Sequence, residues 1–197
     1  MPVPRIAKRA DAVRNVERIV DAAITCLSDR PSASMTDIAK EAGLGRVTLY
    51  GHFASRADLL EAVVARVLEK NESALSTVDL AGNPRDALIR VIDSSWMLTN
   101  QARSIVAAAE DELSPERMNE LHARPAARVE SLVERGRAQG VFRTDMPTSW
   151  LVNVIHQVLH GAATEVSTGR LDPRDASDLI TTTILAVLDN PRISSDR

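Results

Sequence analysis

The stretch from Met35 to Leu60 constrains the fold more than any other part of the chain. It reads MTDIAKEAGLGRVTLYGHFASRADLL and predicts three short helices joined by tight turns. Thr36 is a suitable N-cap for the first helix, because its hydroxyl can accept a hydrogen bond from the first turn. Gly43 can adopt the left-handed conformation that ends this helix. Two short helices around a glycine-containing turn are typical of a helix-turn-helix, whose second helix enters the major groove of DNA.

The second and third helices of this stretch carry signals of their own. In residues 46–53, apolar and polar side chains are arranged so that one side of a helix is buried and the other exposed. Ser55 and Asp58 have the spacing of a capping box, in which two side chains each accept a hydrogen bond from the other residue's backbone N–H. Apolar residues continue at helical spacing from Leu59 onward, which predicts a longer third helix.

Four motifs in this stretch resemble the DNA-binding domain of TetR-family (tetracycline-repressor-like) bacterial transcription regulators. They are TDIA at 36–39, AGL at 42–44, TLYGHF at 48–53 and SRADLL at 55–60. The resemblance covers residues 14–65. It implies an all-α fold of about nine helices. The N-terminal part would be a three-helix helix-turn-helix DNA-binding domain, and the C-terminal part a helical domain for ligand binding and dimerisation.

The division of the chain follows from this resemblance and from local helix signals. We predict a flexible basic arm at residues 1–13, a helix-turn-helix domain at 14–60, a helical effector-binding and dimerisation domain at 61–190, and a tail at 191–197. Capping residues followed by proline at 83–84, 114–115 and 172–173 each predict a helix start. Residues 83–99 and 102–113 are predicted as separate helices. The last two predicted helices carry wide apolar stripes, and in the family the corresponding helices form a homodimer interface.

DNA contacts are predicted on the outward side of the second helix and beside it. Arg46 can donate two hydrogen bonds to guanine, a pairing worth about 1–3 kcal/mol of discrimination. Thr48 can contact a thymine methyl group or a phosphate, and the resemblance assigns Tyr50, His52 and Arg56 to phosphate. Gly51 replaces the larger side chain of many relatives, so no operator sequence is carried over. The predicted DNA-binding residues are Thr36, Arg46, Val47, Thr48, Tyr50, Gly51, His52 and Arg56.

The charge of the chain is unevenly distributed. The net charge is −3, yet residues 1–56 contain nine Lys and Arg against six Asp and Glu, which gives +3 there and −6 in the remainder. A positive N-terminal part on an acidic body favours phosphate binding by the N-terminal part. An ordinary uneven distribution of surface charge would give the same two net charges. The charge therefore supports the interpretation of the motifs but does not by itself indicate DNA binding.

Several classes of protein are not indicated. No apolar run approaches the length of a membrane span and no signal-peptide core is present, which predicts a cytoplasmic protein. The single cysteine, Cys26, fits a reducing compartment. No phosphate loop or nucleophile motif occurs, so neither an enzyme nor a cofactor is predicted. His156 and His160 lie one helical turn apart and could bind a metal, but no third ligand is identifiable and no metal site is predicted.

These patterns together predict a homodimeric DNA-binding repressor of transcription that a small-molecule effector of unknown identity releases from a near-palindromic operator. Two copies are expected because a two-fold dimer reads two half-sites. The predicted effector pocket is lined by Trp96, Met97, Met118, His122, Phe142, Trp150 and His156. The alternative is an all-helical dimer that binds a ligand or a protein without sequence-specific DNA binding, and the acidic body and Gly51 favour it.

Overall fold

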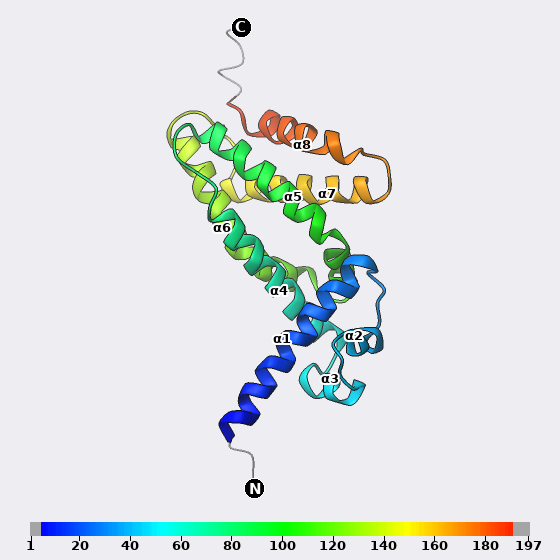
Figure 1. Ribbon diagram of the computed structural model, residues 1–197. Coiled ribbons are helices and arrows are strands. Elements are labelled where there is room, and N and C mark those ends of the chain that lie inside the picture. The colour runs from blue at the N-terminus through cyan, green and yellow to red at the C-terminus, as the bar shows by residue number, and fades with distance from the viewer. Residues whose placement is uncertain (1–4, 191–197) are drawn as a thin grey trace. The chain divides into compact units, whose positions relative to one another are not determined.

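The computed structural model describes residues 5–190, with side chains at 11–118, 120–123 and 126–190, and its regular structure is helical (Figure 1). The all-α fold class is confirmed. The described residues form eight helices: α1 (Arg5–Asp29), α2 (Met35–Glu41), α3 (Arg46–His52), α4 (Arg56–Leu75), α5 (Pro84–Glu110), α6 (Pro115–Ala138), α7 (Thr148–Ser167) and α8 (Pro173–Leu188). None of these eight has both the length and the apolar character needed to cross a membrane.

The structure differs from the prediction at two helix boundaries. Residues 83–99 and 102–113, predicted as two helices, belong to the single helix α5 as far as Glu110. The junction reads Thr-Asn-Gln-Ala and contains no glycine or proline that would end a helix. α1 begins at Arg5, so residues 5–13 are helical although they were predicted as part of a flexible arm. Alanine and arginine are frequent in this segment, and both favour helix.

The N-cap of α2 is Ser34 and not the predicted Thr36. The Ser34 hydroxyl accepts a hydrogen bond from the Asp37 N–H at 3.2 Å, and the Asp37 carboxylate accepts one from the Ser34 N–H at 2.9 Å. The Ser34 N–H and the Ser34 hydroxyl, the latter at 2.8 Å, both donate to the Asp37 carboxylate and lower the pKa of this carboxyl group. Thr36 lies within the first turn with an exposed side chain. The predicted capping box at the start of α4 is confirmed, because Ser55 and Asp58 exchange the corresponding hydrogen bonds, each at 3.0 Å.

Replacement of Ser34 by alanine is expected to lower the free energy of unfolding by about 1 kcal/mol, because the first turn of α2 loses its acceptor. The matched control is Thr36→Ala, which is expected to change this free energy by less than about 0.5 kcal/mol because Thr36 is exposed. Urea denaturation followed by far-UV circular dichroism measures both. Equal destabilisation by the two substitutions would contradict the assignment of Ser34 as the cap.

The described helices form two compact units. The first comprises residues 5–69 and 104–121, and the second comprises residues 70–103 and 122–190. α4, α5 and α6 therefore each contribute to both units. The sequence analysis placed the boundary after residue 60 and assigned residues 104–121 to the C-terminal domain. Residues 104–121 join the first unit from later in the chain, and no local pattern in the sequence indicates which unit such a segment joins.

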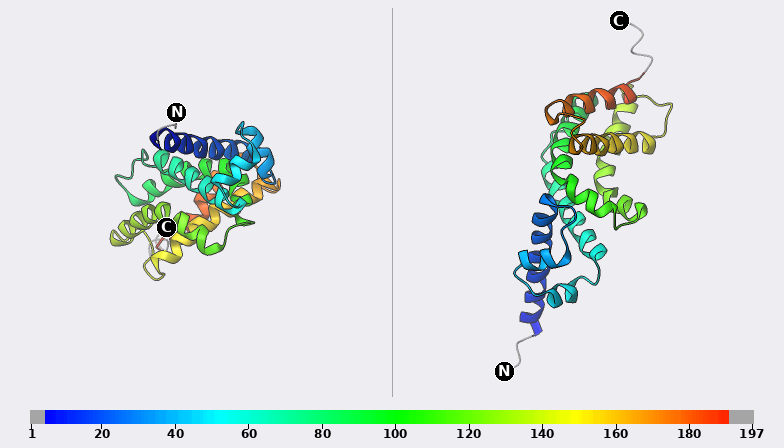
Figure 2. Two further views of the ribbon diagram at one scale, coloured as in Figure 1. Left: turned by 90° about the horizontal axis from the view of Figure 1, so that it is seen from below. Right: turned by 90° about the vertical axis from the view of Figure 1, so that its right-hand side faces the viewer.

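The core of the first unit supports the helix-turn-helix. α2 and α3 pack on α1, as Figures 1 and 2 show. Gly43 follows α2 with a φ of 63°, as predicted, and Leu44 packs against the core. The buried residues of this core include Ile19, Leu27, Ile38, Leu49, Leu59, Val63, Ile105, Ala108 and Ala109.

The core of the second unit includes α7 and α8, which lie side by side (Figure 2). Every fourth residue along α7 is buried, so one face of this helix is covered; these residues are Leu151, Ile155, Leu159 and Ala163. Trp96 of α5 belongs to the same core.

A close contact in the second unit joins the end of α6 to the segment that follows it. Phe142 is fully buried, and its backbone N–H donates a hydrogen bond to the Gly136 carbonyl at 3.2 Å. A Cβ atom at Gly136 would lie 2.1 Å from Cδ2 of the Phe142 ring. Glycine is therefore the residue that lets the Phe142 ring lie against the α6 backbone.

Candidate nucleic-acid interface

One face of α3 is exposed, and the opposite face packs against the core of the first unit. Leu49 is fully buried and Phe53, which follows the helix, is 8% exposed, so these two side chains anchor it. On the opposite side, Val47 is 88% exposed, and Arg46 and Thr48 are exposed too. A short helix anchored on one side leaves its other side available to base edges in a major groove.

Arg46 and Tyr50 form a pair on the exposed face of α3. They are four residues apart, so their side chains lie on the same side of the helix. The Arg46 guanidinium carbon lies 5.4 Å from the centroid of the Tyr50 ring. Such a cation–π contact is worth about 0.5–1 kcal/mol at exposed sites. The contact restricts the arginine without using its hydrogen-bond donors.

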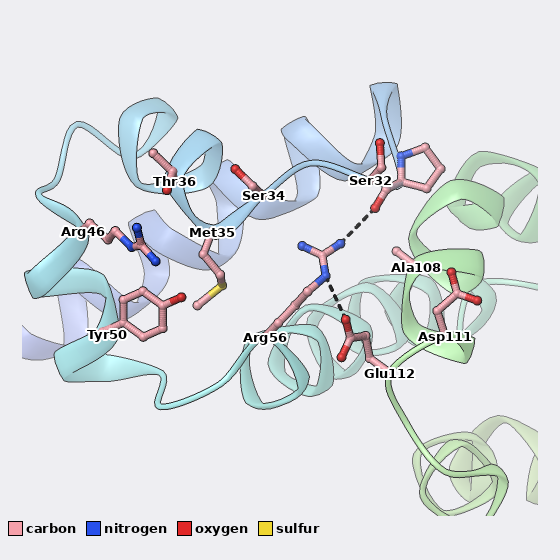
Figure 3. A pocket seen from close by; sticks show the side chains of 11 residues that line it. Ser32, Ser34, Met35, Thr36, Arg46, Tyr50, Arg56, Ala108, Asp111 and Glu112 are labelled. Carbon is pink, nitrogen blue, oxygen red and sulfur yellow. Dashed lines mark hydrogen bonds and ion pairs between the residues drawn. The ribbon is translucent and has the colours of Figure 1, made fainter.

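An open groove of about 630 Å³ lies beside α3 within the first unit (Figure 3). It brings together four of the eight predicted DNA-binding residues: Thr36, Arg46, Tyr50 and Arg56. The other four are on α3 but do not line the groove: Val47, Thr48, Gly51 and His52. The remaining lining residues are Pro31, Ser32, Ser34, Met35, Ala108, Asp111 and Glu112.

Arg56 has protein partners that the sequence analysis did not anticipate. Its Nη1 donates to the Ala33 carbonyl. Its Nη2 donates to the Pro31 carbonyl at 2.9 Å, and its Nε lies 3.4 Å from Oε1 of Glu112 (Figure 3). The side chain is only 23% exposed. Arg56 therefore ties the start of α4 to the loop before α2 and to the turn after α5. Its contact with phosphate stays a prediction.

Arg18 is a functional candidate that sequence reasoning missed. Its Nη2 donates to the Ala42 carbonyl at 2.7 Å, which satisfies the C-terminus of α2. A Cβ atom at Gly43 would lie 3.2 Å from the same Nη2. Arg18 thus fixes the turn between the two helices of the motif. The sequence analysis counted Arg18 only as a positive charge, because no local pattern links a residue on α1 to this turn.

Gly51 lies in α3 with open space where a side chain would be, since a Cβ placed there meets no atom within 4 Å apart from those of its chain neighbours and the backbone of α3. Glycine inside a helix costs about 1 kcal/mol relative to alanine. Gly51→Ala is therefore expected to raise the free energy of unfolding by up to about 1 kcal/mol, measured by urea denaturation. A loss of stability would mean that the α3 backbone needs glycine at this position.

The residues predicted to line an effector pocket are not gathered into one place. Trp96 and Phe142 are buried in the core of the second unit, whereas Met97 is 57% and Trp150 55% exposed. Met118 packs against the core of the first unit. Of the seven, the rings of His122 and His156 form a direct contact, with centroids 4.9 Å apart.

His160 joins this contact, so that three histidines of the second unit lie together. The sequence analysis recognised His156 and His160 as a pair but found no third partner, which the structure supplies as His122 of α6. Burial lowers the pKa of His156 and of His160 to about 4, and the neighbouring imidazoles contribute to both shifts. Both rings are therefore uncharged at neutral pH.

Comparison with known sequences finds a family model that covers the helix-turn-helix. The family model described as "Bacterial regulatory proteins, tetR family" matches residues 19–63. Over 84 residues the chain is 36% identical to the HTH-type transcriptional repressor LfrR of Mycolicibacterium smegmatis. Over 70 residues it is 41% identical to the HTH-type transcriptional regulator EthR of Mycobacterium tuberculosis. These matches cover 43% and 34% of this chain but only 44% and 32% of the two relatives.

Solved structures extend the similarity of fold to most of the chain. A TetR-family transcriptional regulator from Rhodococcus sp. has a TM-score of 0.72 at 17% identity, with 89% of this chain and 98% of that chain covered. The crystal structure of LfrR in complex with proflavine has a TM-score of 0.64 at 27% identity, with 87% and 95% covered.

Proposed function

Because the chain belongs to the TetR family of bacterial regulatory proteins, we propose that it is a sequence-specific DNA-binding regulator that represses transcription. The observation that carries this proposal is the exposed polar face of α3 on a buried support. Arg46 offers donors for guanine, and Val47 and Thr48 offer methyl groups that can contact thymine. The direction of control follows the name of LfrR, a transcriptional repressor.

The remaining polar residues of the first unit have supporting roles in this proposal. Tyr50, His52 and the exposed Thr36 donate hydrogen bonds to phosphate, which fixes the orientation of α3 without reading sequence. Arg56 acts as a positioning residue. Its hydrogen bonds to the Pro31 and Ala33 carbonyls hold the loop before α2, and through that loop the angle at which α3 meets DNA.

A homodimer is part of the proposal, with α7 and α8 as its interface. Trp150 of α7 and Leu179 of α8 are large apolar residues with 55% and 52% of their surface exposed. The exposed residues of α7 are all uncharged: Ser149, Trp150, Asn153, Gln157, Gly161, Thr164 and Ser167. On α8 the exposed residues include the charged Arg174, Asp175 and Asp178, so the uncharged part of the proposed interface lies on α7. An exposed tryptophan on a mainly uncharged helix face is typical of a protein interface. Two-fold pairing would present two α3 helices to two half-sites.

Replacement of Trp150 by aspartate is expected to convert a dimer into a monomer, because it would bury an unpaired charge in the proposed interface. Analytical ultracentrifugation at several protein concentrations measures the oligomeric state. Met97→Asp is the matched control, since Met97 is 57% exposed on α5, outside the proposed interface. A wild-type monomer, or a Trp150→Asp dimer as stable as the wild type, would contradict this interface.

A small-molecule effector that weakens DNA binding is also proposed for the second unit. Support comes from the LfrR structure, which is a complex with proflavine. Among the predicted pocket residues, His122 and His156 lie in contact and Trp96 is in the nearby core cluster of the same unit. Proflavine fluorescence titrated with the protein in the absence of DNA tests this part. No change in fluorescence would exclude proflavine as a ligand and leave the DNA-binding proposal unaffected.

The DNA-binding proposal is tested by fluorescence anisotropy with DNA from upstream of the protein's own gene. Binding is expected to resist scrambled competitor and to weaken steeply with salt, because phosphate contacts release counterions. A specific site is expected to bind about 10³-fold or more tightly than scrambled DNA. If the upstream DNA binds no more tightly than scrambled DNA, the next experiment is a genome-wide pull-down. The absence of any enriched site in that pull-down would overturn the proposal.

The second candidate function is a helical dimer that binds a ligand or a protein and no specific DNA. Gly51 favours it, because the position carries no side chain to contact DNA, and so do the carboxylates of Asp111 and Glu112 at the groove beside α3. The same anisotropy experiment separates the two functions. Weak, salt-sensitive binding without sequence preference is the result expected for this alternative.

A further inference from the structure

Three imidazole rings converge in the second unit from two helices. His122 lies on α6, and His156 and His160 lie one turn apart on α7. The ring centroids are 4.2 Å apart for His156 and His160, 4.9 Å for His122 and His156, and 5.8 Å for His122 and His160. One ring nitrogen from each residue lies within 4.8 Å of the other two. Three of the four histidines in the chain are thus gathered in one cluster.

We propose that this cluster, the three-histidine site, binds a divalent late transition metal, with Zn²⁺ as the first candidate. Imidazole nitrogen is a preferred ligand of Zn²⁺, Ni²⁺ and Cu²⁺, whereas Mg²⁺ and Ca²⁺ prefer oxygen. Among the described side chains the cluster consists of histidines and contains no carboxylate. Three protein ligands leave a fourth tetrahedral position for water or a small anion.

The geometry of the three-histidine site is close to what such a metal requires. Zn²⁺ binds imidazole nitrogen at about 2.0–2.1 Å, which places tetrahedral ligand atoms about 3.3 Å apart. The nitrogens already lie within 4.8 Å of one another, so small rotations of the imidazole side chains would close the site. The i, i+4 spacing of His156 and His160 puts both rings on one helix face, the spacing that zinc-binding His-Glu-x-x-His helices use.

The three proposed ligands come from two helices of the same unit, one from α6 and two from α7. A bound ion would tie α6 to α7 within the second unit. This proposal goes beyond DNA recognition, which belongs to the first unit, and it can be tested without DNA.

The test uses the full chain without a polyhistidine tag, freed of metal by a chelator and then titrated with Co²⁺ and with Zn²⁺. We expect one Co²⁺ per chain, with the intense visible absorption of four-coordinate cobalt, and displacement of that absorption by Zn²⁺. The melting temperature is expected to rise by about 5–10 °C at a Zn²⁺ concentration 100 times the Kd. Tryptophan fluorescence follows this unfolding, because Trp96 and Trp150 both lie in the second unit.

Three single variants make the test specific. His122→Gln and His160→Gln remove ligands from different helices, and each is expected to weaken binding more than about 100-fold, beyond what the loss of an outer-shell partner costs. His52→Gln makes the same change on α3, in the first unit, and is expected to leave metal affinity unchanged. Circular dichroism of each metal-free variant checks that it is folded. Absence of the cobalt spectrum in the wild type, or equal affinity in a folded His122→Gln or His160→Gln chain, would overturn the proposal.

Discussion

Replacement of Gly136 by alanine is expected to lower the free energy of unfolding of the protein by about 2 kcal/mol, and its melting temperature by about 4–8 °C. The new Cβ atom would lie 2.1 Å from Cδ2 and 2.4 Å from Cε2 of Phe142. The Phe142 ring is fully buried and cannot move away without disturbing its neighbours. Alanine would gain about 1 kcal/mol in helix propensity, which the overlap outweighs.

The measurement for Gly136→Ala is thermal unfolding followed by tryptophan fluorescence. Trp96 is 6% exposed in the same core as Phe142, so its emission reports on the core that the substitution disturbs. Gly51→Ala is the matched control, because the same change is made in a helix where nothing lies within 4 Å of the new atom. If Gly136→Ala were as stable as the wild type, the ring and the α6 backbone could not be as close as the structure has them.

Arg46→Ala is expected to reduce the affinity for a specific DNA site by about 5- to 150-fold, equivalent to about 1–3 kcal/mol, and to reduce the affinity for scrambled DNA much less. The reason is that Arg46 is exposed on α3 and its stacking on Tyr50 leaves its N–H donors available to a base edge. Fluorescence anisotropy with both DNA molecules measures the ratio of the two affinities. Arg66→Ala, an exposed arginine on α4, serves as the control for loss of one positive charge.

Arg46→Lys distinguishes a contact with a base from a contact with phosphate. Lysine keeps the charge but lacks the planar fork that binds guanine through two hydrogen bonds. A base contact predicts that Arg46→Lys loses most of the preference for the specific site while the salt dependence stays the same. If Arg46→Lys kept the full preference, Arg46 would be a phosphate ligand, and another residue of α3 would have to read the sequence.

Local features of the fold could be predicted from the sequence because their causes lie within a few residues. Asp172 caps α8, with Pro173 as the first residue of the helix, and Ser55 caps α4, both as predicted. Gly140 follows α6 with a φ of 72°, a conformation for which glycine is the usual residue after a helix end. The cap of α2 was assigned to Thr36 instead of Ser34 because both residues suit the role. Only the exchange of hydrogen bonds with Asp37 decides between them.

Contacts between distant parts of the chain could not be predicted in this way. The partners of Arg56 lie 25 residues before it, at Pro31, and far beyond it, at Glu112. The third histidine of the cluster, His122, is on a different helix from His156. Nothing in the residues around any of these positions indicates its partner, because tertiary packing alone brings them together. The face of α3 could be predicted, since its anchors and its exposed residues alternate within one helix.

The first unit is assembled from two separate stretches of chain, which limits how it can be isolated. A fragment ending at Glu69 would contain the whole helix-turn-helix but would lack Ile105, Ala108 and Ala109. Each of these is at most 3% exposed and belongs to the same core as Ile38 and the other anchors of the motif. The surface they cover would then face water, and such a fragment is expected to aggregate. A chimeric protein built on the proposed DNA-binding unit would therefore have to carry residues 104–121 as well as residues 5–69.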